Sequence, residues 1–278
     1  MPMLPKYINL YKCPSCRNHI VRQTVLEGTN KNAELYSDGR YIAPQLPQLP
    51  KLVKCKRCET IFWLHKQGKV STRVNDEACR KASNLSARDK ILSRYAKGII
   101  PEKPGIGDYS NEFYELNSDP DTAAETSQKF HNDGVSIFKS TTSTISDKSF
   151  EKIDKAEYMT IEDYFFAISK GLAENNKEEL EIRIKIWWTY NDRVRKGLPL
   201  YNDEDDEADW KLNLIELLVL LDKNDFNDKI LIAEIFRSLG DFNRCLSIIN
   251  TLGPEYSWIS ENFKKQCEIG NKLVFKLY

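Results

Sequence analysis

The chain contains two Cys-x-x-Cys pairs, Cys13-Pro-Ser-Cys16 and Cys55-Lys-Arg-Cys58, with 38 residues between them. Each pair places two sulfur atoms on one tight turn, and two such turns supply the four thiolates typical of structural zinc sites. Four sulfur ligands complete a tetrahedron and leave no open position for a substrate. The spacing therefore predicts a structural Zn²⁺ site made of Cys13, Cys16, Cys55 and Cys58, with a rubredoxin-like iron as the alternative metal.

The remaining cysteines, Cys79, Cys245 and Cys267, are scattered and make the total of seven an odd number. This usage fits a reducing cytoplasm with one metal site better than a secreted disulfide framework. We expect Cys245 and Cys267 to be small buried apolar residues, because no histidine accompanies them as a base. The sequence has no apolar run of 18 residues and no secretory signal at its start, so we expect no membrane span and a cytoplasmic location.

The pattern of polar and apolar residues predicts a multi-domain chain. Residues 1–75 show short alternating stretches and turn residues, which predict a small β zinc ribbon. Residues 76–156 are rich in Ser, Thr, Asp, Asn, Gly and Pro without a sustained period, which predicts a largely disordered linker. Residues 157–278 are predicted to form an all-α domain. The core of the ribbon is expected to contain Ile20, Val25, Leu35, Ile61 and Trp63.

Six helices are expected in the C-terminal part. The first should begin with a capping box at Thr160–Asp163, and an acidic loop at Asp203–Glu207 should precede the third. The third helix is apolar on most sides, which predicts deep burial. The later helices are expected at Asn176–Arg195, Trp210–Leu221, Phe226–Leu239, Phe242–Leu252 and Trp258–Leu277.

Residues 230–252, ILIAEIFRSLGDFNRCLSIINTL, resemble one tetratricopeptide repeat (TPR). Ala233 and Phe236 match the small and aromatic positions of the first helix of the repeat, and Gly240-Asp241-Phe242 matches the turn between its helices. Cys245 occupies the position of the small residue that packs between the two helices. The resemblance implies TPR-like helical hairpins.

The order of motifs along the chain resembles an uncharacterised bacterial family of zinc-ribbon proteins with a TPR-like C-terminus. The motifs are the zinc ribbon with its Ser37-Asp38-Gly39 turn and proline-rich return, and the helical sequences IWWTYNDRVRKG and AEIFRSLGDF. The resemblance covers residues 10–65 and 158–278 and implies architecture alone.

Charge is unevenly distributed along a chain whose formal net charge is zero. Residues 1–75 hold 13 Lys and Arg against 4 Asp and Glu, a net charge of +9, whereas residues 158–278 carry −6. Two interpretations are open, because the basic ribbon could bind an anionic partner or the two halves could attract each other. The basic residues around the second pair, which could contact phosphates or form a solvated face, are Lys51, Lys54, Lys56, Arg57, Lys66 and Lys69.

The segment Trp187–Lys196 combines adjacent tryptophans with arginines. Aromatic and arginine side chains could anchor a peptide or a nucleic acid base. In the alternative interpretation, Trp187 packs in the core and Arg193 pairs with Asp192 or the acidic loop.

No catalytic signature is found in the sequence, so we expect a protein that is not an enzyme. The preferred hypothesis is a binding or adaptor protein in which residues 158–278 contact a protein partner. The alternative is a nucleic-acid-binding or transcription-associated protein that uses the basic ribbon.

Overall fold

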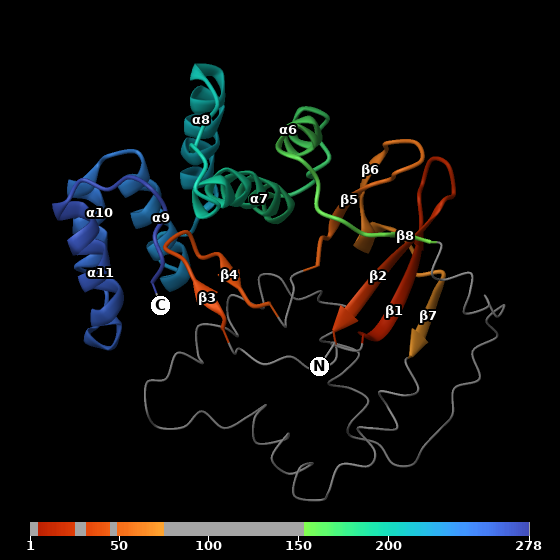
Figure 1. Cartoon of the computed structure of the whole chain (residues 1–278), viewed down its shortest axis with the longest axis horizontal. Helices are drawn as coiled ribbons and strands as arrows, with labels where there is room; N and C mark the ends of the chain where they lie inside the picture. Colours follow the sequence, from red (N-terminus) through yellow and green to blue (C-terminus); the bar gives the residue numbers. More distant parts are fainter. Residues whose placement is uncertain (1–4, 26–31, 45–48, 75–152, 278) are drawn as a thin grey trace, which may run out of the picture. The chain divides into compact units, whose positions relative to one another are not determined.

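The computed structural model of the chain describes residues 5–25, 32–44, 49–74 and 153–277 (Figure 1). Contacts divide the chain into two compact units, and each unit combines segments that are distant in sequence. The first unit comprises Met1–Asn30 and Gln45–Tyr158, and the second comprises Lys31–Pro44 and Met159–Tyr278. The predicted linker, 76–156, lies outside the described residues except for its last four.

The first unit contains a four-stranded sheet with the order β7-β1-β2-β8. Its strands are β1 (Pro5–Lys12), β2 (His19–Val25), β7 (Ser71–Val74) and β8 (Asp154–Lys155). Strand β1 is antiparallel to both β2 and β7, and β8 runs parallel to β2. Asn18 Nδ2 donates to Asp154 Oδ2 at 2.8 Å, and the Ala156 N–H donates to the Val21 carbonyl at 2.8 Å. The described end of the predicted linker is therefore part of the N-terminal sheet.

A second hairpin, β5 (Leu52–Lys54) and β6 (Ile61–Trp63), is followed by the short 3₁₀ helix η1 (Leu64–Lys66). The core of the unit is formed by side chains from both hairpins around the cysteines, namely Tyr11, Cys13, Ile20, Val53, Cys55, Phe62 and Leu64. Ile20 is a core residue, as predicted. Ile61 and Trp63 are also buried, on the strand face opposite to Phe62 because side chains alternate. The side chain of Val25 lies outside the described residues.

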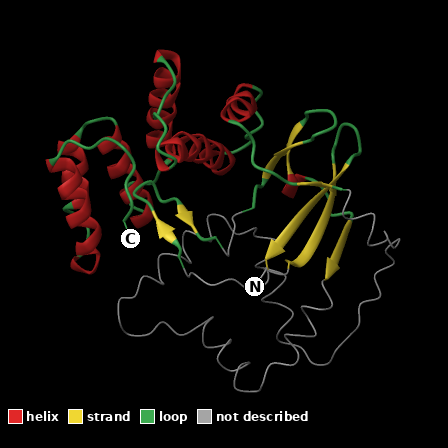
Figure 2. Cartoon of the chain, viewed as in Figure 1, coloured by secondary structure: helices red, strands yellow, loops and turns green. Residues whose placement is uncertain are grey.

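The helical unit contains six α-helices among the described residues (Figure 2). They are α6 (Ile161–Ser169), α7 (Asn176–Arg195), α8 (Glu204–Leu220), α9 (Phe226–Ser238), α10 (Phe242–Ile249) and α11 (Ser257–Glu268), with the 3₁₀ helix η2 (Pro254–Tyr256) before α11. In the part of the chain that the structure describes, none of these helices combines the length and the apolar character that crossing a membrane requires.

The start of α6 confirms the predicted capping box. The Thr160 hydroxyl accepts from the Asp163 N–H, and the Asp163 carboxylate accepts from the Thr160 N–H. The start of α8 differs from the prediction, because residues 204–207 are its first turn and Asp203 is its cap. Four acidic residues interact favourably with the positive end of the helix dipole, so the presumed acidic loop begins the helix.

The predicted deep burial of the third helix is wrong for one face of α8. Leu214 and Leu217 are fully buried, but Leu212, Ile215 and Val219 are 56%, 51% and 77% exposed. The helix contacts its neighbours on one side only, so its second apolar row has no partner within the described residues. The last helix also differs, because α11 ends at Glu268 and is followed by Gly270 at φ 67° instead of continuing to Leu277.

A small hairpin, β3 (Glu34–Leu35) and β4 (Tyr41–Ile42), belongs to the helical unit and not to the ribbon, where the boundary 1–75 placed it. Its turn contains Gly39 at φ 72°, a conformation that glycine adopts without strain. In Figure 1, β3 lies beside the C-terminal end of the chain. Leu35 is therefore buried in the helical unit and is not a ribbon core residue. The cause is a set of long-range contacts described below.

Candidate metal centre

The two Cys-x-x-Cys turns have the same backbone geometry. In the first turn the Cys13 N–H donates to the Asn18 carbonyl at 2.8 Å, and the Arg17 N–H donates to the Cys13 carbonyl at 3.1 Å. In the second turn Cys55 and Glu59 make the equivalent bonds, at 2.9 Å to the Thr60 carbonyl and 2.8 Å to the Cys55 carbonyl. Each turn therefore connects its two strands and presents both of its sulfurs on one side.

The residue that follows each second cysteine has a left-handed backbone. Arg17 has φ 61° and Glu59 has φ 59°. L-residues with a side chain adopt this region at a cost, so the surrounding hydrogen bonds must hold it. This conformation turns the chain sharply after Cys16 and Cys58 and returns it to the next strand.

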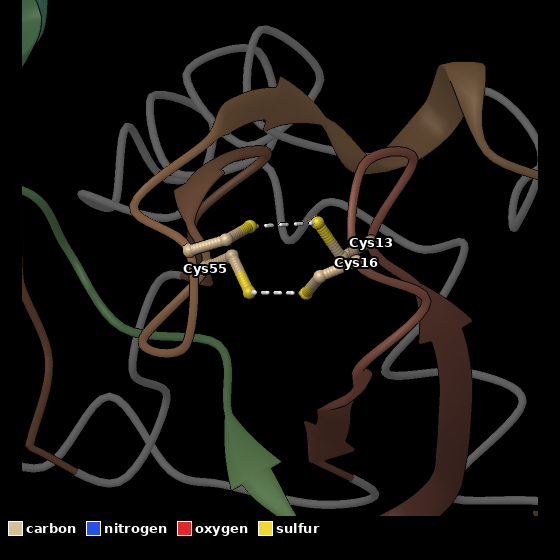
Figure 3. A group of neighbouring side chains, drawn as sticks. Cys13, Cys16 and Cys55 are labelled. Atoms are coloured by element: carbon tan, nitrogen blue, oxygen red, sulfur yellow. Dashed lines mark hydrogen bonds between the residues drawn. The ribbon is translucent and has the colours of Figure 1, made fainter.

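The four sulfur atoms form one compact group. Cys13 Sγ lies 3.6 Å from Cys58 Sγ, and Cys16 Sγ lies 3.6 Å from Cys55 Sγ. All four atoms lie within 4.8 Å of one another. Figure 3 shows the sulfurs of the two turns pointing toward each other across the space between them. Because sulfurs about 2.3 Å from a tetrahedral ion are about 3.8 Å apart, these four cysteines could hold one metal ion.

The immediate surroundings act differently on the individual cysteines: they favour a thiolate at Cys58 and oppose one at Cys13. Backbone N–H groups of Ser15 and Cys16 point at Cys13 Sγ, and the Thr60 N–H points at Cys58 Sγ. The Thr60 hydroxyl also lies 3.2 Å from Cys58 Sγ. These bonds lower the pKa of Cys58 to about 6, whereas burial raises the pKa of Cys13 to about 12. A bound cation would stabilise all four thiolates, so protons are released when the metal binds.

The conspicuous tryptophans of α7 are both buried. Trp187 is 1% exposed and Trp188 is 5% exposed. Arg193 pairs with Asp206 in the first turn of α8 at 3.2 Å, which agrees with the alternative that Arg193 binds the acidic segment. Trp188 is therefore not an exposed anchor, because the β3–β4 hairpin covers it. Its indole Nε1 donates to the Asp38 carbonyl at 2.9 Å, and the Arg40 guanidinium lies 4.7 Å from its ring centroid.

A buried polar network holds the hairpin turn, and sequence reasoning missed it. The Asp38 carboxylate is fully buried and accepts from Asn191 Nδ2 at 2.7 Å. It also forms an ion pair with Arg195. Ser37 Oγ donates to Glu234 Oε1 at 2.7 Å, and Glu234 is in turn paired with Arg237 at 2.6 Å.

The sequence contains no local signal for these contacts. The partners of Ser37 and Asp38 stand 150 or more residues later in the chain. The sequence does show that Glu234 and Arg237 are charged residues within the apolar second half of α9, ILIAEIFRS. Burial raises the pKa of Glu234, which the bonds from Arg237 and Ser37 oppose.

Of the basic residues near the second turn, Lys56, Arg57 and Lys66 are exposed, and Lys51, Lys54 and Lys69 are half-buried. Lys56 pairs with Glu157 at 2.9 Å, within the same unit. Arg57 is exposed at the tip of the turn.

The predicted burial of Cys245 and Cys267 is confirmed, and their sulfurs lie 3.6 Å apart between α10 and α11. Burial raises the pKa of both thiols, so they remain protonated.

Comparisons with models of protein families, with curated protein sequences and with solved structures gave no match to this chain.

Proposed function

We propose that this protein is a non-enzymatic adaptor in which a zinc-stabilised ribbon is joined to a TPR-like helical unit that binds another protein. The observation that carries this proposal is the exposed apolar row of α8, formed by Leu212, Ile215 and Val219. Their spacing places them on one helix face. Contiguous exposed apolar side chains on a soluble protein favour a contact with another macromolecule.

Zinc is the proposed metal because the donor set consists of four thiolates in a small module. Zn²⁺ binds such a set without redox chemistry, and the closed coordination gives the ion a structural role. The alternative, a rubredoxin-like iron, would be detected by its colour and redox activity. The proposed location of the protein is the cytoplasm, which keeps thiols reduced. None of the six cysteines in the described residues forms a disulfide.

The TPR-like character of the helical unit is supported by the geometry of α9 and α10. Gly240 has φ 87° at the turn, and Asp241 caps α10 through a bond from the Arg244 N–H at 3.0 Å. Ala233 and Cys245 are fully buried, which fits the small residues expected where two helices approach closely.

A capture experiment with the full chain tests the adaptor proposal. The tagged wild-type protein and an Ile215→Ser/Val219→Ser variant serve as baits in the same extract, with exposed Lys223→Ser as the matched control. We expect a protein that the wild type and Lys223→Ser retain and the double variant loses. If the wild type and the double variant retain the same proteins, the α8 row is not the binding surface and the proposal is wrong.

The second candidate function is nucleic acid binding by the ribbon. The net charge of +9 in residues 1–75 and the exposed Arg57 favour it. Phosphate binding by lysine and arginine weakens steeply with added salt. Single-stranded and double-stranded probes at 50 mM salt and above test this function. An affinity that is absent at the lowest salt, or does not change with salt, would exclude it.

A further inference from the structure

The β3–β4 hairpin contacts the helical unit through a compact set of polar groups at its tip. Asp38 provides its carboxylate to Asn191 and Arg195 and its carbonyl to Trp188. Ser37 donates to Glu234. Three residues of the turn therefore supply groups to side chains of α7 and α9: Ser37 a hydroxyl, Asp38 a carboxylate and a carbonyl, and Arg40 a guanidinium. Charge-assisted hydrogen bonds such as those to Asp38 are stronger than bonds between neutral groups.

The segment before this turn forms an isolated β-bridge with the C-terminal segment of the chain. The Ser37 N–H donates to the Phe275 carbonyl at 2.9 Å, and the Leu277 N–H donates to the Leu35 carbonyl at 2.8 Å. Tyr36 and Lys276 form the bridge between them. Main-chain bonds of this kind give affinity in peptide recognition, and side-chain sites give specificity.

The charged groups that receive the turn keep partners of their own on the helical unit. Arg195 pairs with Asp192 at 2.6 Å, one helical turn away. Glu234 and Arg237 pair with each other, and Arg237 also donates to the Leu273 carbonyl at 2.8 Å. The Lys185 ammonium lies 4.3 Å from the Trp188 ring centroid. Removal of the hairpin would therefore leave none of these charges without a partner, which avoids the largest penalty for opening the site.

The two ends of the hairpin are adjacent, because Glu34 pairs with Ile42 and Leu35 with Tyr41. The segment leaves the ribbon unit after residue 30 and returns to it at residue 45. The segment is therefore an insertion in the sequence of the ribbon unit that packs on the helical unit.

We propose that the surface formed by Trp188, Asn191, Arg195 and Glu234 is a binding site for a β-turn peptide that contains aspartate, and that residues 31–44 are its displaceable ligand in the same chain. A partner that uses this site carries the same chemistry, a Ser-Asp-Gly turn on an extended strand. This inference deepens the proposed adaptor function and rests on it. The attached hairpin has an effective concentration in the millimolar range, so it holds the site until a tighter turn displaces it.

The test uses the full chain and a labelled synthetic peptide of residues 31–44. A Ser37→Ala/Asp38→Ala variant weakens the attached ligand and leaves every residue of the receiving surface intact. We expect this variant to bind the peptide at least about tenfold more tightly than the wild type, whose site is already filled. A peptide with the same two substitutions should bind the variant at least about tenfold more weakly than the wild-type peptide does. Fluorescence anisotropy measures both affinities, and circular dichroism verifies the helical content of each chain.

Two results would overturn the proposal: a folded variant that binds no peptide, or equal binding to the variant and the wild type. If the variant does not fold, a second measurement replaces it. Specific protease sites inserted at 26–31 and 45–48 allow residues 31–44 to be cut free in an otherwise unaltered protein. The labelled peptide should then exchange with the bound fragment. A fragment that never exchanges, or loss of the helical fold after cleavage, would show that the hairpin is a fixed structural element.

Failure of this inference is distinct from failure of the adaptor proposal. The peptide experiment concerns the surface around Trp188 and needs no external partner. The capture experiment concerns the row on α8. If the peptide does not bind but Ile215 and Val219 still retain a partner, the inference about the hairpin is wrong and the adaptor proposal stands.

Discussion

At the scale of single residues, Thr60 distinguishes the second cysteine turn from the first. Its hydroxyl and its backbone N–H both contact Cys58 Sγ, and its carbonyl accepts from the Cys55 N–H. The equivalent residue of the first turn is Asn18, whose side chain donates to Asp154 instead. The hydroxyl of Thr60 therefore stabilises a thiolate at Cys58 in a way that the first turn does not repeat.

Substitution of Thr60 by valine should weaken metal binding while preserving the shape of the side chain. Loss of an outer hydrogen bond to a ligand typically lowers metal affinity about 10- to 100-fold. Competition with a chromophoric chelator measures the effect on the full chain. Thr60→Ser retains the hydroxyl and should remain within a few-fold of the wild type. Equal affinity of the valine variant and the wild type would contradict the assigned role.

The left-handed backbone of Glu59 gives a second prediction. Glycine adopts φ 59° freely, whereas a β-branched residue is strongly disfavoured there. Glu59→Val should therefore destabilise the second turn by about 1–2 kcal/mol, and Glu59→Gly should not. Chemical denaturation of the metal-loaded protein compares the two. Because Glu59 is exposed, loss of its side chain alone is not expected to matter. A glycine variant as unstable as the valine variant would contradict this explanation.

At the scale of elements, the junction between α7 and α8 is organised by one carboxylate. Asp206 accepts from the Asn202 N–H at 2.9 Å, from the Tyr190 hydroxyl at 3.2 Å and from Arg193 at 3.2 Å. The bond from the Asn202 backbone, together with Tyr190 and Arg193, lowers the pKa of Asp206. The ionised form is thus favoured in the folded protein.

The lowered pKa predicts a pH-dependent effect of Asp206→Asn. A carboxyl group whose pKa is lower in the folded state contributes stability above its ordinary pKa of about 4, and this contribution is lost as the pH falls through the folded value. We expect Asp206→Asn to lower the free energy of unfolding by about 1 kcal/mol at pH 7, with a difference that shrinks below about pH 4. Denaturation at several pH values measures this. Exposed Asp209→Asn on the same helix is the control, and a pH-independent difference for Asp206→Asn would contradict the prediction.

Helix positions were predictable where the signal is local. The Thr160 capping box fixes the start of α6 because both of its hydrogen bonds lie within four residues. The start of α8 was missed because a run of acidic residues is typical of loops. In the first turn of a helix, however, acidic side chains interact favourably with the positive end of the helix dipole. The exposed row of α8 could not be predicted, since apolar residues around a helix do not reveal which side has a neighbour.

At the scale of the whole molecule, the four cysteines were predictable because their spacing carries the chemistry. The location of residues 31–44 was not. The segment stands between the two cysteine pairs in sequence, yet its partners are Trp188, Asn191 and Arg195 of α7 and Glu234 of α9. Contacts over such separations depend on the assembled helices and leave no periodic pattern in the sequence.

The connectivity of the chain gives the metal centre its importance. The chain passes from one unit to the other three times, after residues 30, 44 and 158. A metal ion bound by all four cysteines would close the loop of residues 17–54, which contains the hairpin docked on the helical unit. The described core side chains of the ribbon unit surround the cysteines, so its fold should depend on the ion.

The metal content of the purified full chain tests this account most directly. Elemental analysis and native mass spectrometry should find one zinc ion per chain, and Cys55→Ser should lose it and destabilise the ribbon. Cys245→Ser is the control, because Cys245 lies between α10 and α11 and should leave the zinc in place. A folded wild-type chain without stoichiometric metal, with its four ribbon thiols freely titratable, would contradict the central claim.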